Sequence, residues 1–185
     1  PQPLARRRRA QAVSGSPTSP TLVGRARAKV RGTADDLVAA RRTMRGGRLS
    51  LAAHLVHERA SLLHSPWSGR PAEVRTGTGT SIRYRANPGD VRSLREVWFE
   101  DVYRLPEHWR PRTVLDLGAN IGLTSLWFHQ RWPEARFVLV EPDPANVVLA
   151  RRNLDTNGVL GMVLAAAVGP EAGSARFASD AASNL

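Results

Sequence analysis

The chain has 185 residues, of which 42% are hydrophobic, and this is enough apolar material for the core of about one domain. It contains no cysteine, which excludes a disulfide-stabilised scaffold and a cysteine-ligated metal protein. No stretch approaches the roughly 20 apolar residues of a membrane span, and the arginines at 6–9 are followed by Ser, Gly and Pro rather than by the apolar core of a signal peptide. We therefore expect a cytoplasmic protein without a membrane partner.

The formal net charge of +11 is concentrated in the first quarter of the chain. Residues 1–48 carry 12 Lys and Arg against 2 Asp and Glu, whereas the remaining residues are almost balanced. All eleven aromatic residues lie from Trp67 onward, so residues 1–48 have no large ring with which to form a core or to stack on a base. We interpret residues 1–48 as a basic tail, disordered or partly helical, and regard a nucleic-acid partner as the less favoured alternative.

The chain begins at Pro1 rather than at a methionine, which places the start of translation upstream or at an internal residue such as Met44. Residues 1–43 are rich in Arg, Ala, Ser and Pro. This bias suggests the hypothesis that residues 1–43 do not belong to the native product, and peptides from this range in the endogenous protein would contradict it.

Residues 49–110 are expected to form a helix, a hairpin and a second helix that lead into the core. Ser50 is a plausible N-cap for a helix that continues to about His64 and ends at Pro66, with Leu51 and Leu55 on one side.

The hairpin is predicted by apolar alternation on both sides of a Gly-Thr-Gly-Thr turn over residues 72–85. A second turn is expected at the Asn-Pro-Gly of residues 87–89, and the spacing of apolar residues predicts a helix over about 92–103.

Residues 111–185 alternate between apolar strands and helices, a pattern typical of a parallel sheet covered by helices. Asp143 and Pro144 are suited to the N-cap and the first position of the second helix, and Gly158 to its end. The predicted strands are residues 113–118, 136–140 and 162–168. This order predicts a right-handed βαβαβ unit.

Two polar features follow the first two predicted strands, and ligands of open α/β sheets bind at this end of the strands. The first is the glycine-containing loop after Asp116, in which Asn120 is the non-glycine residue best able to adopt a left-handed conformation. The second is Glu141, which follows Gly122 by 19 residues, about the separation at which a carboxylate meets ribose hydroxyls.

A nicotinamide dinucleotide is disfavoured as the ligand, because the glycine spacing is wrong. The dinucleotide fingerprint requires glycine where this chain has Asn120 and Leu123. Asp116 would also repel a diphosphate, whereas it suits the cationic methionine end of S-adenosylmethionine.

These residues resemble the FkbM-type S-adenosylmethionine-dependent methyltransferases, which have the class I fold. The similarity covers about residues 72–185 and does not include the basic tail. Its strongest segments are residues 97–103, 114–122, 140–144, 152–158 and 166–169. The resemblance implies that the loop binds the methionine part of the cofactor and that Glu141 binds the ribose hydroxyls. The implied cofactor-binding residues are Asp116, Gly118, Ala119, Asn120, Gly122 and Glu141.

The resemblance further implies an O-methyltransferase, in which a hydroxyl oxygen of a small molecule or glycan attacks the sulfonium methyl group. The expected fold is an α/β, Rossmann-like class I methyltransferase sheet, truncated after about the third core strand, with an N-terminal helical and hairpin extension. The expected boundaries are 1–48 for the tail, 49–110 for the extension and 111–185 for the cofactor domain. The family's later strands have no counterpart here, so a fragment or truncated gene product is expected.

Three other interpretations remain open. A non-catalytic remnant would bind the cofactor without turnover, and a nucleic-acid-binding protein would use the arginine-rich tail in a salt-sensitive manner. A dehydrogenase is the least favoured. His54 and His57 could in principle bind a metal, but no carboxylate or cysteine partner accompanies them in the sequence, so a partly exposed helix face is the simpler interpretation. The sequence identifies neither the catalytic base, the acceptor nor the oligomeric state.

Overall fold

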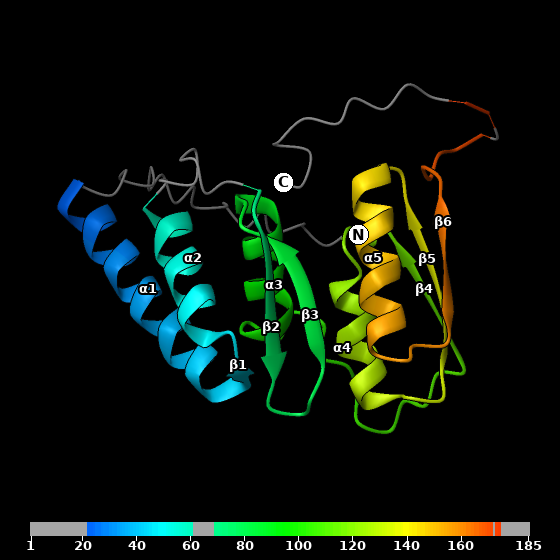
Figure 1. The fold of residues 1–185 in the computed structure, drawn as a ribbon, viewed down its shortest axis with the longest axis horizontal. Coiled ribbons are helices and arrows are strands. Elements are labelled where there is room, and N and C mark those ends of the chain that lie inside the picture. The colour runs from blue at the N-terminus through cyan, green and yellow to red at the C-terminus, as the bar shows by residue number, and fades with distance from the viewer. Residues whose placement is uncertain (1–21, 61–68, 172, 175–185) are drawn as a thin grey trace, which may run out of the picture.

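The computed structural model describes residues 22–60, 69–171 and 173–174. It contains an antiparallel sheet in the order β1-β2-β3 and a parallel sheet in the order β4-β5-β6. Helices α4 and α5 lie between the hairpin and the parallel sheet, while α1 and α2 lie on the far side of the hairpin (Figure 1).

The antiparallel unit consists of α1 (Leu22–Thr43), β1 (Met44–Gly46), α2 (Arg48–Arg59), β2 (Pro71–Thr76), β3 (Ser81–Arg85) and α3 (Pro88–Trp98). The parallel unit consists of β4 (Thr113–Leu117), α4 (Leu123–Arg131), β5 (Arg136–Glu141), α5 (Pro144–Thr156) and β6 (Gly161–Ala165).

For the described part of residues 1–48, the expectation of disorder is wrong, whereas the partly helical alternative is seen. Helix α1 and strand β1 occupy residues 22–46, and β1 pairs with β2 in the antiparallel sheet. Ala40 and Met44 belong to the buried core, and Asp36 is buried in an ion pair with Arg59 of α2 at 3.0 Å. The bounds of this helix are not predictable from the sequence pattern, because it buries few apolar residues and is held partly by charge. Residues 1–21 lie outside the described residues.

Helix α2 begins two residues before the predicted cap, Ser50, and ends at Arg59 rather than at His64. Its N-cap is Gly47, whose φ of 71° is left-handed. A Cβ atom there would lie 2.3 Å from the carbonyl oxygen of Glu73, so the close approach of β2 requires glycine. Leu51 and Leu55 are fully buried as expected. His64 and Pro66 lie outside the described residues.

The hairpin is confirmed, with β2 and β3 antiparallel and Val74 opposite Ile82. The second predicted turn instead starts a helix, because the Asn87 side chain accepts a hydrogen bond from the Asp90 amide at 2.7 Å and Pro88 takes the first helical position. Helix α3 therefore covers Pro88–Trp98 rather than residues 92–103.

The parallel unit is confirmed element by element. Thr113 pairs with Arg136, and Phe137 pairs with Gly161, which sets the parallel register of β4-β5-β6. Asp143 caps α5 by accepting from two backbone amides, and Gly158 has a φ of 64° just beyond the helix. The third strand ends at Ala165 rather than at residue 168.

One face of the parallel sheet packs on α4 and α5, and the other is uncovered by any described residue. Leu115 and Met162 flank Val138 in one row of the register, and both are more than half exposed. Leu117 and Leu164 form the next row and are about half exposed. The core lies on the helical side, around Leu126 and Phe137. Within the described ranges, no helix is long and apolar enough to cross a membrane.

Helix α5 completes the free edge of the hairpin with two side-chain amides. The Asn157 amide accepts from the Ser81 N–H at 2.9 Å and donates to the Ser81 carbonyl at 2.7 Å. The Asn153 amide makes the same pair of bonds with Arg83, at 2.9 and 3.0 Å. Because Ser81 and Arg83 are alternate residues of β3, two asparagines one helical turn apart act as the neighbouring strand would, and they join the antiparallel unit to the parallel unit.

Candidate functional site

The loop between β4 and α4 turns through three left-handed residues. Gly118, Asn120 and Gly122 have φ angles of 75°, 50° and 81°, so Asn120 adopts the conformation expected for it. At Gly122 an added Cβ would lie 3.3 Å from Leu154 and 3.4 Å from Leu139, so this glycine also allows the loop to pack closely on the core. The Gly118 and Ala119 amides donate to the carbonyl of Val140, which fixes the loop against the end of β5.

Glu141, at the end of β5, bonds directly to this loop. Its Oε2 atom accepts from the Asn120 amide at 2.8 Å, and its Oε1 atom accepts from the Asp143 amide at 2.9 Å and from the Asn146 side chain at 3.3 Å. The residue is only 5% exposed. The two polar features of the sequence therefore meet in the structure, and three of the roughly four lone pairs of the carboxylate are used internally.

Asp116 lies at the end of β4, on the side of the sheet that faces α4. Its Oδ2 atom accepts from the Ser125 hydroxyl at 2.7 Å. Burial raises the pKa of Asp116 above its ordinary value, the hydrogen bonds from Ser125 oppose this rise, and the charge of Glu141 adds to it. The two carboxylates thus repel each other, and a bound cation would relieve that repulsion.

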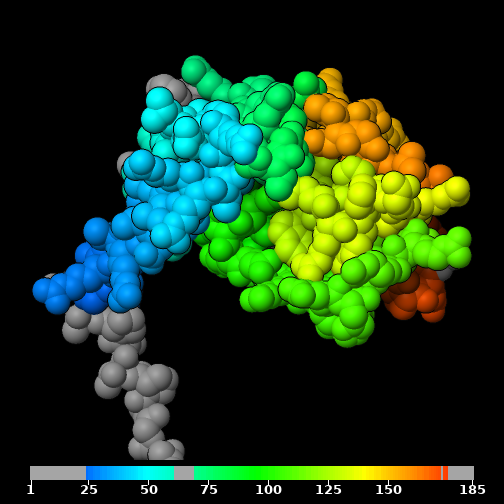
Figure 2. Space-filling model, turned by 90° about the horizontal axis from the view of Figure 1, so that it is seen from below, coloured from blue at the N-terminus to red at the C-terminus, as the bar shows by residue number. Residues whose placement is uncertain are grey.

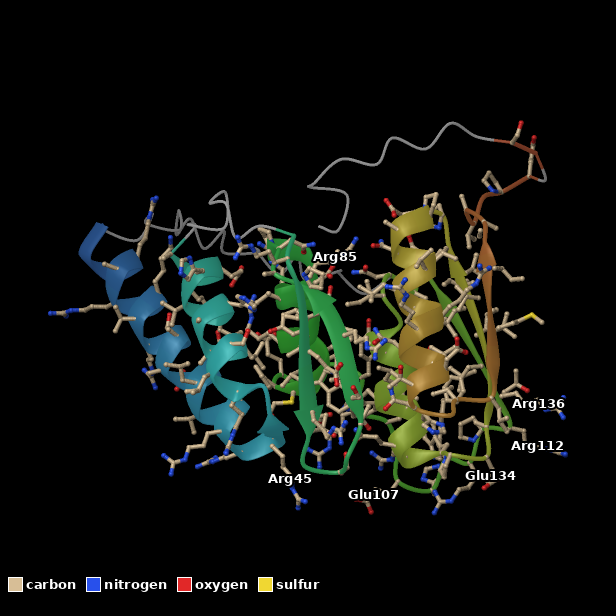
Figure 3. The ribbon with its side chains drawn as sticks, in the orientation of Figure 1. Arg45, Arg85, Glu107, Arg112, Glu134 and Arg136 are labelled. Atoms are coloured by element: carbon tan, nitrogen blue, oxygen red, sulfur yellow. The ribbon has the colours of Figure 1, made fainter. Side chains whose placement is uncertain are left out.

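A partly buried cation, Arg85, is connected to Glu141 through Asn146, and sequence reasoning missed it. The Arg85 guanidinium donates to Asp90 through Nε at 2.9 Å and Nη2 at 2.8 Å, and Nη2 also donates to Asn146 Oδ1. Asn146 in turn donates to Glu141. The hydrogen bond with Asp90 raises the pKa of Arg85, and the charges of Asp90, Asp143 and Glu141 also raise it, against the effect of burial. Figure 3 shows Arg85 at the upper end of β3, between α3 and α5.

The loop also has features that a ligand could use. The side-chain Nδ2 atom of Asn120 donates to the Ser93 hydroxyl of α3 at 3.3 Å. The Oδ1 atom of the same side chain is buried without a hydrogen-bond partner. An added Cβ at Gly118 would meet no atom within 4 Å, so open space lies beside that residue. Asn120 thus offers an unused acceptor on a loop with room next to it.

His54 and His57, the two histidines considered as metal ligands, lie on helix α2. In the described ranges, no three His, Asp or Glu side chains are grouped so as to hold a metal ion. His54 instead shares a 2.9 Å hydrogen bond with the buried Tyr84 hydroxyl. Burial lowers the pKa of His54, and His57 adds to this effect. His64 lies outside the described residues.

Comparison with known proteins agrees with this geometry. The family model for the methyltransferase small domain matches residues 102–178, the range that holds the loop and Glu141. The parallel unit that carries most of this match has a Rossmann-like α/β fold. A chain similar to it is "Methyltransferase sdnD" of Sordaria araneosa, 37% identical over 65 residues, which are 35% of this chain and 24% of the relative.

A second similar chain is "Methyltransferase 1" of Beauveria bassiana (strain ARSEF 2860), 25% identical over 68 residues, or 37% of this chain and 27% of the relative. The chain spans about a quarter of the length of the curated relatives it matches. No solved structure matches it significantly.

Proposed function

We propose that this chain contains the cofactor-binding region of an S-adenosylmethionine-dependent O-methyltransferase of the FkbM type. Its acceptor is a hydroxyl group of a small molecule or glycan. The observation that carries the proposal is the 2.8 Å hydrogen bond from the Asn120 amide to Glu141, because it joins the glycine loop and the strand-end carboxylate into one structure. The methyltransferase small domain match over residues 102–178 supports the same reaction class.

The described residues fit this cofactor. Asp116 would supply negative charge for the cationic methionine end, and the buried Asn120 Oδ1 atom lacks a donor that an amino group or hydroxyl could supply. The remaining lone pair at Glu141 Oε2 is available to one ribose hydroxyl. When bound, S-adenosylmethionine supplies an activated methyl group that an acceptor oxygen attacks, releasing S-adenosylhomocysteine. The protein's contribution is mainly to hold and orient the reactants.

Glu141→Ala should weaken S-adenosylhomocysteine binding by about tenfold or more, or about 1.4 kcal/mol, because it removes the ribose acceptor and releases the Asn120 amide. Calorimetric titration measures the affinity, and circular dichroism establishes that each variant is folded. Glu134→Ala is the matched control, because it removes an exposed carboxylate that lies two residues before the start of β5, whereas Glu141 lies at its end. If the alanine variant unfolds, Glu141→Gln keeps the size of the side chain and one acceptor oxygen. A folded wild-type chain without affinity would contradict the proposal.

Asp116→Asn should stabilise the free protein near neutral pH while weakening S-adenosylhomocysteine binding by about tenfold. Burial raises the pKa of Asp116 above 3.8, so the folded state holds its proton more tightly than the unfolded chain. Stability therefore falls as pH rises from about 3.8 through the raised value, and the loss persists above it. An asparagine keeps an acceptor for Ser125 and removes this loss. Urea denaturation at several pH values measures the effect, with the exposed Asp155→Asn as a control that should change neither quantity.

A further inference from the structure

A concave site lies at the opposite end of the parallel sheet from Glu141. It is a hollow of about 510 Å³ where β4 and β5 begin. Arg136 and Glu141 are the first and last residues of β5, so about 17 Å of strand separates the two ends. We call this feature the arginine hollow, and its lining includes Arg110, Arg112, Arg131, Trp132, Glu134 and Arg136.

The four arginines come from three separate places in the chain and are brought together by the fold. The Arg136 amide donates to the Arg112 carbonyl at 3.0 Å, which places Arg112, just before β4, beside Arg136, the first residue of β5. Arg131 ends α4, and Arg110 lies in the segment before β4. Figure 3 shows Arg112, Arg136 and Glu134 together at the lower end of the sheet, and Figure 2 views the molecule from this end.

Two of these guanidinium groups are already held in position. Arg110 donates to the carbonyls of Glu107 and of Trp109, the latter at 2.8 Å. Arg131 lies over the ring of Trp132 at 6.0 Å, a cation–π contact. Trp132 is 6% exposed and donates its indole N–H to the Trp109 carbonyl at 3.1 Å, so the wall of the hollow is fixed. A ligand would therefore meet a partly preorganised group of donors.

The charges in the hollow are unbalanced. Elsewhere Arg59, Arg85 and Arg95 each pair with a buried carboxylate. In the part of the chain that the structure describes, none of the four hollow arginines has a carboxylate within 4.0 Å, and Glu134 is the one acidic residue in the lining. Positive charge gathered in a concave site concentrates the field on an anion.

We propose that the arginine hollow binds a phosphate or diphosphate group of a small ligand such as a nucleotide or a sugar phosphate. Guanidinium forks match phosphate oxygens in bidentate geometry, and four arginines in the lining of one hollow suit an anion with several oxygens. The volume suits a small ligand. A nucleic-acid backbone presents the same phosphates, but along an extended strand rather than in a single hollow. The site is independent of the proposed methyl transfer, because it lies at the other end of β5.

The test is calorimetric titration of the full chain with inorganic diphosphate. Arg112→Gln combined with Arg136→Gln should weaken binding by about tenfold or more. The matched control is Arg41→Gln combined with Arg42→Gln, which removes the same charge from an exposed part of α1 and should change affinity less than about twofold. The four arginines replaced in the two double variants are all exposed. Both variants should therefore keep the wild-type melting temperature and the wild-type affinity for S-adenosylhomocysteine.

Absence of diphosphate binding by the wild-type chain would overturn the proposal. Equal losses in the two double variants would also overturn it, because net charge rather than the hollow would then explain binding. A single-stranded oligonucleotide gives the third comparison. If it binds through Arg112 and Arg136 while diphosphate does not compete, the ligand is a nucleic-acid strand and the small-ligand proposal fails.

Discussion

Asp90→Ala should destabilise the protein by about 3–5 kcal/mol, because it leaves the Arg85 guanidinium partly buried without its carboxylate. Asp90 is fully buried and accepts from the Arg85 backbone amide at 2.7 Å as well as from its side chain. Urea denaturation monitored by circular dichroism measures the loss. We also expect weaker S-adenosylhomocysteine binding in any folded fraction, since Arg85 orients Asn146 and Asn146 donates to Glu141.

The matched control for this prediction is the other ion pair of the hairpin. Glu73 and Arg83 are 3.3 Å apart, with side chains 45% and 44% exposed, so water screens their attraction. Glu73→Ala should cost about 1 kcal/mol or less. If both alanine variants lose the same free energy of unfolding, burial of the Arg85 pair is not what stabilises this part of the fold.

The parallel unit could be predicted from sequence because its determinants are local. Each strand is a short apolar run, each helix has its own start and stop residues, and Asp143 with Pro144 marks a helix start within two positions. The left-handed conformation of Asn120 was also predictable from residue type and from its position between two glycines.

The residues that assemble the site were not predictable in the same way. Arg85 and Asn146 are 61 residues apart, and Arg83 and Asn153 are 70 apart, so no local pattern connects them. The one indication in the sequence was the pair Asn153 and Asn157, four residues apart and hence on one face of a helix. The bounds of helix α1 were not predictable for a related reason, because Asp36 of this helix pairs with Arg59 of a different helix.

The strands of the parallel sheet are apolar on both faces, which predicts that other elements pack against both faces. The described residues cover only the face that packs on α4 and α5. On the other face Leu115, Leu117, Met162 and Leu164 range from 44% to 61% exposed, in two adjacent rows of the register. The apolar residues on both faces therefore correctly predict the strands. The described residues pack against only one of the two faces.

Asn153→Ala should cost about 3 kcal/mol or more, because it leaves three backbone groups of two separate segments without their partner. Asn153 is fully buried, and besides its two bonds to Arg83 it donates to the Ile121 carbonyl at 2.8 Å. That carbonyl belongs to the glycine loop of the candidate site. The variant should therefore also weaken S-adenosylhomocysteine binding, by about tenfold. Urea denaturation and calorimetric titration measure the two effects.

Asn157→Ala distinguishes the two roles of the α5 asparagines, which are to bond to β3 and, for Asn153, to bond to the Ile121 carbonyl of the loop. Asn157 makes the same bonds to Ser81, but its third bond, at 2.7 Å, is to the Asn153 carbonyl within α5 rather than to the loop. It is also only partly buried, so its loss should cost about 1–2 kcal/mol and leave S-adenosylhomocysteine affinity unchanged. Equal loss of affinity in both variants would mean that the junction of the hairpin with α5, and not the bond to Ile121, holds the loop in its binding conformation.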